Sequence, residues 1–226
     1  MFNKINIIIP STHSDDEMKE FISMIKNTCN CEHEIYFITN KEGIGLAQLY
    51  SDVMNKIKDE VFVFIHDDIV FLKSGWGAEV LRLFNENEDY GIIGVAGSKE
   101  FNEQAMWWTN KKCYGQVMHE NDGQKYLTQY SPLLKQDLEE VCVIDGLFMA
   151  VAKNRLGSDF DKSINGFHFY DITFCLDNYL SGWCKIGVTT NIRILHKSVG
   201  KLNQGWFDNR EIINLKYKKH YPIRVK

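Results

Sequence analysis

Short apolar runs alternate along the chain with segments whose apolar residues recur at helical spacing. The runs occupy residues 5–9, 34–39, 61–65 and 91–97, and Pro10 is expected to end the first of them. Apolar runs of this length are typical of strands buried on both faces. Because such strands belong to sheets covered by helices on both faces, the pattern predicts an α/β fold with a mostly parallel central sheet.

The segments between the apolar runs predict helices. One helix is expected to begin near Asp15, because acidic residues fill its first turn and Met18, Phe21 and Ile25 share one face. The remaining predicted elements are helices at about 46–57, 75–86 and 169–180, an apolar run at 141–152 and a strand near 185–195.

The regular alternation lapses between about 98 and 140, where Gly, Asn, Gln and aromatic residues mix without a clear period. Trp107 and Trp108 argue against disorder, so this segment is predicted to be an irregular insertion over the sheet, where α/β proteins place their ligands. Residues 1–226 are therefore expected to form one domain that ends in a basic tail from about 200 to 226.

Composition narrows the class of protein. The chain has 226 residues, 44% hydrophobic and 25% charged, which is the usage of a packed soluble protein. Its net charge of -4 at pH 7 argues against a nucleic-acid partner. Cys29 and Cys31 are the one closely spaced cysteine pair, a weak zinc signal. Without a signal-peptide pattern or an apolar run long enough to cross a membrane, a cytoplasmic location is expected.

Three places carry candidate chemistry. Asp67 and Asp68 follow the apolar run 61–65, and carboxylates at the end of a buried strand suit Mg²⁺ or Mn²⁺, although such a pair also caps ordinary turns. Asp171 opens a predicted helix, as a cap or as a catalytic acid or base. His196 ends a strand, either as a structural histidine or as a cation ligand.

A nicotinamide enzyme is disfavoured. Gly43 and Gly45 lie between a predicted strand and a helix, as in a dinucleotide fingerprint, but Gln48 occupies the third small-residue position. No phosphate-binding loop of the Walker type, nucleophile elbow or HExxH zinc motif occurs in the sequence.

Taken in order, these pieces resemble the family-2-type glycosyltransferases of the GT-A fold, in a branch of short bacterial proteins with a histidine before the acidic motif. The resemblance covers roughly residues 5–200. It is carried by Ile7-Ile8-Ile9-Pro10, Gly43-Ile44-Gly45-Leu46-Ala47, Phe64-Ile65-His66-Asp67-Asp68-Ile69, Gly94-Val95-Ala96-Gly97-Ser98, Asp145-Gly146-Leu147-Phe148-Met149-Ala150, Phe169-Tyr170-Asp171-Ile172 and His196.

The resemblance implies a Rossmann-like nucleotide-diphospho-sugar transferase with a site that can be assigned by residue. Asp68 would bind Mn²⁺ or Mg²⁺ together with His196, and Asp171 would be the general base. The nucleotide-sugar donor would lie along Pro10, Ser11, Asn40 and Asp67. The sequence departs from the family at three positions, where an acid is usual or frequent and this chain has Asn40, Tyr170 and Thr173.

The implied function is metal-dependent, inverting sugar transfer to a glycan or lipid-linked acceptor in bacterial polysaccharide biosynthesis, with a UDP-sugar as the expected donor. Trp107, Trp108 and Asp145 are the candidate acceptor residues, although burial or turn capping also explains them. The main alternative is an inactive GT-A module that binds a nucleotide or glycan. A sugar nucleotidyltransferase is disfavoured, because it would require a glycine-rich basic loop and residues 11–17 do not form one.

The end of the chain suggests contact with a membrane. Residues 215–226 contain five basic residues and no acid. They are interleaved with the apolar side chains of Leu215, Tyr217, Tyr221 and Ile223. A basic segment with interleaved apolar side chains is typical of peripheral attachment to anionic lipid, which would place the protein at the inner face of the membrane.

Overall fold

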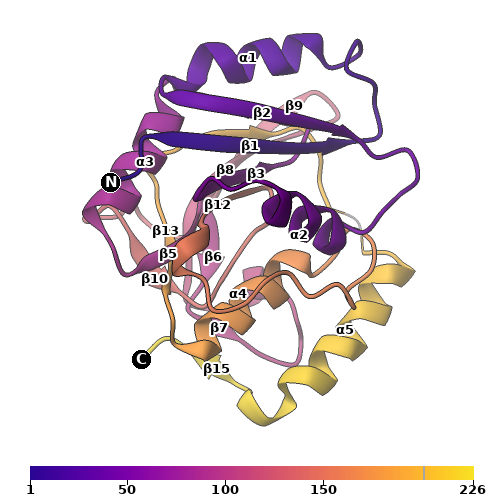
Figure 1. Ribbon diagram of the computed structural model, residues 1–226. Helices are drawn as coiled ribbons and strands as arrows, with labels where there is room; N and C mark the ends of the chain where they lie inside the picture. The colour runs from indigo at the N-terminus through magenta and orange to yellow at the C-terminus, as the bar shows by residue number, and fades with distance from the viewer. Residues whose placement is uncertain (201) are drawn as a thin grey trace.

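A seven-stranded sheet forms the centre of the computed structural model, which describes residues 1–200 and 202–226 (Figure 1). The strand order is β10-β13-β5-β12-β3-β1-β2. Strands β1, β2, β3, β5 and β13 run in one direction, while β12 and β10 run against their neighbours. The bounds are β1 Lys4–Ser11, β2 Glu32–Thr39, β3 Val61–Ile65, β5 Tyr90–Gly94, β10 Glu139–Val141, β12 Phe148–Ala152 and β13 Lys185–Val188.

A second sheet lies beside the first and has the order β11-β6-β8-β14-β4, with β9 paired to β8. A short ribbon joins β7 and β15. The bounds are β4 Ile69–Phe71, β6 Ala96–Ser98, β7 Glu100–Phe101, β8 Cys113–Asn121, β9 Gln124–Gln129, β11 Val143–Ile144, β14 Ile194–His196 and β15 Ile223–Arg224.

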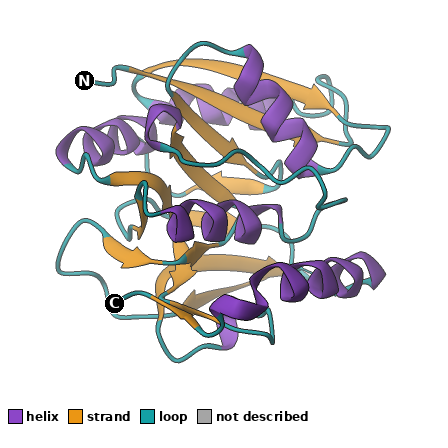
Figure 2. Cartoon of the chain, turned by 60° about the horizontal axis from the view of Figure 1, so that its bottom comes forward, coloured by secondary structure: helices purple, strands orange, loops and turns teal. Residues whose placement is uncertain are grey.

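Helices cover both faces of the central sheet, and Figure 2 shows the strands inside the molecule with helices outside them. Phe64 of β3 packs on Tyr50 of α2, with ring centroids 4.4 Å apart. Phe148 is paired with Ile65 and so points to the opposite face, where it contacts Trp76 of α3. The helices are α1 Lys19–Cys29, α2 Leu46–Lys56, α3 Trp76–Glu86, α4 Tyr170–Ser181 and α5 Gln204–Tyr217.

The predicted fold class, a mostly parallel sheet between helices, is confirmed, whereas several boundaries differ. Pro10 lies inside β1, because beyond Ile8 this strand pairs with β2 alone and the missing N–H leaves no β3 partner unsatisfied. Helix α1 begins at Lys19 instead of Asp15, because Ser14 and Glu17 hydrogen-bond to each other and form a separate turn.

The apolar run 91–97 is divided between two sheets, because β5 ends at Gly94 and β6 begins at Ala96. The glycines on either side of the break make room for β11. A Cβ on Gly97 would lie 2.2 Å from the carbonyl oxygen of Val143, and one on Gly94 would lie 2.8 Å from the side chain of Ile144. Glycine at position 94 therefore lets β11 of the second sheet pack closely on β5 of the first, and glycine at position 97 lets β11 approach its partner β6 within the second sheet.

The segment 98–140 is not irregular, since it contains β7, the hairpin β8–β9 and a 3₁₀ helix, Trp107–Thr109. Strand β8 alternates buried and half-buried residues from Cys113 to Met118. The buried positions are Cys113, Gly115 and Val117, so small residues hide the alternation from a search for strong hydrophobic periodicity.

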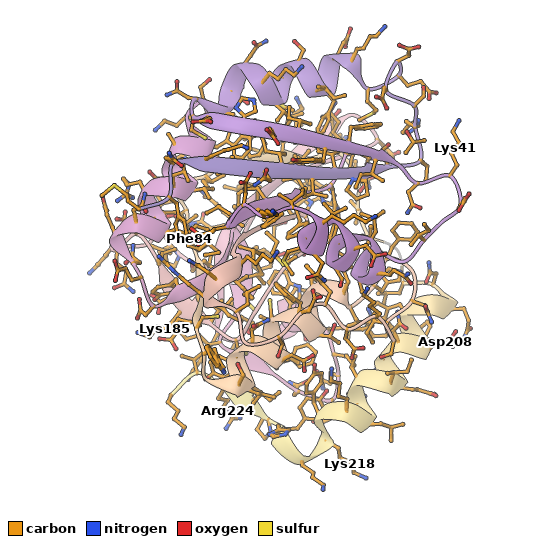
Figure 3. All side chains as sticks on the ribbon, viewed as in Figure 1. Lys41, Phe84, Lys185, Asp208, Lys218 and Arg224 are labelled. Atoms are coloured by element: carbon orange, nitrogen blue, oxygen red, sulfur yellow. The ribbon has the colours of Figure 1, made fainter. Side chains whose placement is uncertain are left out.

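The basic tail expected over 200–226 is largely regular structure, and Lys201 lies outside the described residues. Helix α5 buries Trp206, Ile213 and Tyr217, while Lys218 beyond its end projects outward (Figure 3). Ile223 of β15 is also buried. Most of the apolar residues on which the membrane prediction was based therefore pack in the core, whereas Leu215 is exposed. Within the described residues, no helix combines the length and the apolar character that crossing a membrane requires.

Candidate active site

The ends of three neighbouring strands meet at one edge of the central sheet. Pro10 and Ser11 end β1, Asn40 follows β2, and Asp67 and Asp68 follow β3. Because these strands are parallel, their carboxyl ends open into one cavity of about 260 Å³. The residues lining the cavity are Pro10, Ser11, Thr12, Asn40, Leu46, His66, Asp67, Asp68, Phe167 and Ser198. All five of the predicted donor and cation residues at these strand ends therefore line the same cavity.

The side chain of Asn40 is engaged by its own loop. Its Nδ2 donates to the carbonyl oxygen of Ile44 at 2.8 Å, and its Oδ1 accepts from the Ile44 N–H at 2.9 Å. Its backbone N–H donates to the carbonyl oxygen of Ser11 at 2.7 Å. Asn40 thus holds the loop 40–44 against β1. Both ends of its side-chain amide are already hydrogen-bonded, so the same amide could contact a nucleotide base only by sharing these hydrogen bonds.

A possible cation site brings together His66, Asp68 and His196, which offer one ligand atom each within 4.8 Å of one another. His196 lies opposite Ile69 in the antiparallel pair of β14 with β4, which sets its imidazole beside Asp68. The Asp68 Oδ1 and His196 Nε2 atoms are 3.2 Å apart. Two imidazoles and a carboxylate are a donor set that fits Mn²⁺ and other first-row divalent ions.

The charges of this cluster favour an ionised carboxylate. Burial raises the pKa of Asp68, but the hydrogen bond and charge of His196 outweigh it and bring the pKa to about 2. Burial and the neighbouring His196 lower the pKa of His66, which favours its neutral imidazole. An ionised Asp68 and a neutral His66 are the protonation states that a cation requires of these two ligands. Burial lowers the pKa of His196, but the hydrogen bond and charge of Asp68 outweigh it and raise that pKa, so a cation would displace the His196 proton.

Asp171 lies in the first turn of α4 and is held by two backbone N–H groups. Its Oδ2 accepts from Gly146 at 2.8 Å and its Oδ1 accepts from Ile172 at 2.9 Å. Burial, and next the negative charge of Asp145, raise the pKa of Asp171 to about 7. A fixed carboxylate that titrates near neutral pH is suited to accept a proton from a hydroxyl group. The same two hydrogen bonds also let Asp171 hold the loop at Gly146.

The predicted acceptor residues differ in exposure. Trp107 exposes only 3% of its surface and packs on Tyr130, with ring centroids 5.1 Å apart, so it is a core residue. Trp108 exposes 41%. Asp145 is half-buried and accepts from the Leu147 N–H at 3.0 Å, which is the turn-capping contact. Of the three, Trp108 is the side chain most accessible to an acceptor.

Two histidines of this region were not predicted as site residues: His66, a member of the cation cluster, and His119, which lies beside it. His66 directly precedes the acidic pair, and this position was the one feature of the sequence that could have indicated it as a site residue. His119 of β8 lies beside His196 in the parallel pair β14–β8, with ring centroids 6.0 Å apart. No local pattern identifies His119, because its position depends on how distant strands pair.

The family match and the fold place this protein among the glycosyltransferases of the GT-A fold. Residues 7–217 match the Glycosyltransferase like family, and the chain belongs to this family. The resemblance noted from the sequence is therefore confirmed at the level of family and fold.

The solved structures that match this chain include the following two. GalNAc-T7 with UDP, GalNAc and Mn²⁺ has a TM-score of 0.50 and 12% identity, and the match covers 90% of this chain but 45% of that chain. This chain thus spans less than half of the GalNAc-T7 chain, and the likeness supports the fold alone. A197 from STIV has a TM-score of 0.44 and 12% identity, covering 87% of this chain and 86% of that one. The comparison with curated proteins produced no match.

Proposed function

We propose that this protein transfers a sugar from a nucleoside diphosphate to a hydroxyl group of a glycan or lipid-linked acceptor, with inversion at the anomeric carbon. The observation that carries the proposal is the single cavity at the ends of β1, β2 and β3, where the cluster of His66, Asp68 and His196 lies beside the predicted donor residues. Membership of a glycosyltransferase family supports the same activity.

The donor diphosphate would lie in this cavity, against Pro10, Ser11, Asn40 and Asp67. Asp68, His196 and His66 would hold a divalent cation, which neutralises the negative charge that develops on the leaving diphosphate. Two imidazole ligands favour Mn²⁺ over Mg²⁺, which prefers oxygen ligands and bound water. UDP is the donor nucleotide to test first, because a structural neighbour was solved with UDP and Mn²⁺.

Asp171 would act as the base. As the acceptor oxygen forms its bond to the anomeric carbon, the bond from that carbon to the diphosphate oxygen breaks and the hydroxyl proton passes to the Asp171 carboxylate. A single attack on the face opposite the leaving group inverts the anomeric configuration. Trp108 and Asp145 are the proposed acceptor contacts. We further propose a role in polysaccharide synthesis in the cytoplasm.

A second function is favoured by one departure from the family: a non-catalytic module that binds a nucleotide or glycan. Tyr170 stands where the family usually has a glutamate. Thr173, the other change in α4, is fully buried and donates to the Phe169 carbonyl oxygen at 2.8 Å, so it takes no part in the cavity. The enzyme and the non-catalytic module both bind the donor, and they differ in whether the bound donor is turned over with Asp171 as the base.

The test is thermal unfolding of the wild-type protein and Asp68→Ala with UDP, GDP, CDP and dTDP, each with and without Mn²⁺. A nucleotide at 100 times its Kd stabilises by about 2.7 kcal/mol, or roughly 5–10 °C for a chain of this size. A Mn²⁺-dependent shift for one nucleotide that Asp68→Ala abolishes supports the donor site. No shift with any nucleotide contradicts it.

Turnover separates the enzyme from the module. The wild-type protein is incubated with the sugar derivative of the nucleotide that binds, and release of free nucleoside diphosphate is followed. Turnover that Asp171→Asn abolishes, with the same thermal shift retained, supports the enzyme. Donor binding without turnover by the wild-type protein supports the module.

A further inference from the structure

The hydroxyl of Tyr170 joins the cation cluster to the loop that holds Asp171. Tyr170 exposes only 2% of its surface. Its Oη donates to the carbonyl oxygen of Gly146 at 3.1 Å and lies 2.9 Å from Nε2 of His66. The N–H of the same Gly146 donates to Asp171 at 2.8 Å. One glycine therefore anchors both the tyrosine that touches His66 and the carboxylate proposed as the base.

Counting protons along this chain of hydrogen bonds favours one tautomer of His66. A phenol has one proton, and the carbonyl oxygen of Gly146 accepts but does not donate. When the Tyr170 hydroxyl donates its one proton to Gly146, the contact with His66 is a hydrogen bond only if the His66 proton is on Nε2, so this tautomer is the one that satisfies both contacts at once. A neutral imidazole protonated on Nε2 carries its lone pair on Nδ1. Nδ1 is therefore the atom of His66 that remains for a cation.

Gly146 is in close contact with both side chains of this arrangement. A Cβ on Gly146 would lie 2.2 Å from the Tyr170 Oη and 3.0 Å from the Asp171 Cβ. Both side chains thus pack directly on the glycine, and Tyr170 cannot rotate away without losing its two polar partners in the interior. A glutamate at this position would accept from His66 but, when ionised, would not donate to the Gly146 carbonyl oxygen.

We infer that Tyr170 is a positioning residue that holds His66 protonated on Nε2, so that Nδ1 faces the cation, and that couples this histidine to the loop holding Asp171. The inference rests on the proposed function for the presence of a cation, but the tautomer of His66 is a property of the protein alone. Partners that orient metal-binding histidines in this way typically change metal affinity 10–100-fold when they are removed.

The first experiment measures the tautomer before any metal is added. The ¹⁵N chemical shifts of His66 in wild-type protein should show the proton on Nε2, and Tyr170→Phe should give a mixture of tautomers. Tyr179→Phe is the matched control, because this tyrosine of the same helix donates to a backbone carbonyl oxygen, that of Arg224, at 3.0 Å. A wild-type His66 protonated on Nδ1, or an unchanged tautomer in Tyr170→Phe, overturns the inference.

The second experiment measures Mn²⁺ affinity by calorimetry without nucleotide. Tyr170→Phe should weaken Mn²⁺ roughly 10-fold or more, and Tyr179→Phe should leave it unchanged. His66→Asn places an amide oxygen near the position of Nδ1 and should retain more affinity than His66→Gln, which mimics Nε2. Equal affinity for wild type and Tyr170→Phe, or tighter binding by His66→Gln, overturns the inference while leaving the cation site intact.

Wild-type protein that binds no Mn²⁺ overturns the cation site of the proposed function and, with it, the coupling of Tyr170 to a cation. The ¹⁵N measurement still reports whether Tyr170 sets the tautomer of His66, so the two failures are distinguishable. Thermal unfolding of each variant shows whether the fold is retained. If Tyr170→Phe does not fold, the pair His66→Asn and His66→Gln decides the question.

Discussion

The backbone N–H of Gly146 donates a hydrogen bond of 2.8 Å to the carboxylate of Asp171. This contact joins the loop between β11 and β12 to the first turn of α4, two segments that are distant in sequence. It fixes the carboxylate in a partly buried position beside Asp145, where its pKa rises. The position of the proposed base therefore depends on one small residue.

Gly146→Ala should reduce kcat strongly. The added methyl group would meet the Tyr170 Oη at 2.2 Å and the Asp171 Cβ at 3.0 Å, so α4 or the loop must move. A displacement of about 1 Å at a catalytic group costs on the order of 100-fold in rate. Steady-state kinetics with the donor identified by thermal unfolding measures the effect.

Gly205→Ala is the control for this substitution, because a Cβ there makes only an ordinary contact of 3.4 Å with Asn203. It should leave kcat unchanged. The proposed role of Gly146 is wrong if Gly146→Ala retains wild-type kcat while remaining folded.

The pH dependence of kcat/KM should report Asp171. A base is active in its ionised form, and the pKa of Asp171 lies near 7, so the rate should rise with pH up to about 7 and level off above it. Asp145 contributes to this raised pKa through its negative charge. Asp145→Asn removes that charge and should shift the acid limb of the profile to lower pH.

A second acid serves as the control for the pH profile. Asp89 lies at the amino end of β5, away from the strand ends that form the cavity, and pairs with Lys185 at 2.7 Å (Lys185 is labelled in Figure 3). Asp89→Asn should leave the acid limb in place. If the acid limb of Asp145→Asn is unchanged or shifts to higher pH, the assignment of this limb to Asp171 is wrong.

Local patterns were sufficient to predict the central sheet and the acidic pair. β3 and β12 are buried at every residue, so their apolar sequences alone indicate their place. Asp67 and Asp68 follow directly from the end of β3, since any polar residue there emerges at the edge of the sheet. The division of 91–97 between two sheets was not predictable in this way, because it depends on how closely β11 approaches Gly94 and Gly97.

Local sequence patterns do not predict the cation cluster. His196 reaches Asp68 through the register of β14 against β4, and His119 lies beside His196 through the register of β14 against β8. A shift of one residue in either pair would turn a histidine to the other face. Registers between strands so far apart in sequence follow from the packing of the whole fold. The sequence therefore indicated His196 only as a histidine at a strand end and through the resemblance to a family, and it did not indicate His119.

Tyr50→Phe should stabilise the protein. Tyr50 is fully buried, and its hydroxyl has no hydrogen-bond partner among the residues that the structure describes. Removing an unsatisfied buried hydroxyl recovers about 1 kcal/mol of unfolding free energy, or roughly 2–4 °C in Tm. Tyr217→Phe is the opposite case, because the Tyr217 hydroxyl donates to Asp177 at 2.7 Å, and it should lower Tm. Calorimetry of the two variants checks the pair, and a lower Tm for Tyr50→Phe would show that its hydroxyl is satisfied.

Replacement by alanine should lower the stability of the protein at Trp107 and leave it nearly unchanged at Trp108. Trp107 exposes 3% of its surface and packs on Tyr130, so Trp107→Ala should cost about 3–5 kcal/mol of unfolding free energy. Trp108 exposes 41%, so Trp108→Ala should leave Tm nearly unchanged. If Trp108 contacts the acceptor sugar, this variant should raise KM for the acceptor and leave KM for the donor unchanged. Wild-type KM values for both substrates in Trp108→Ala would remove Trp108 from the acceptor site, because the stability measurement has already shown that its fold is intact.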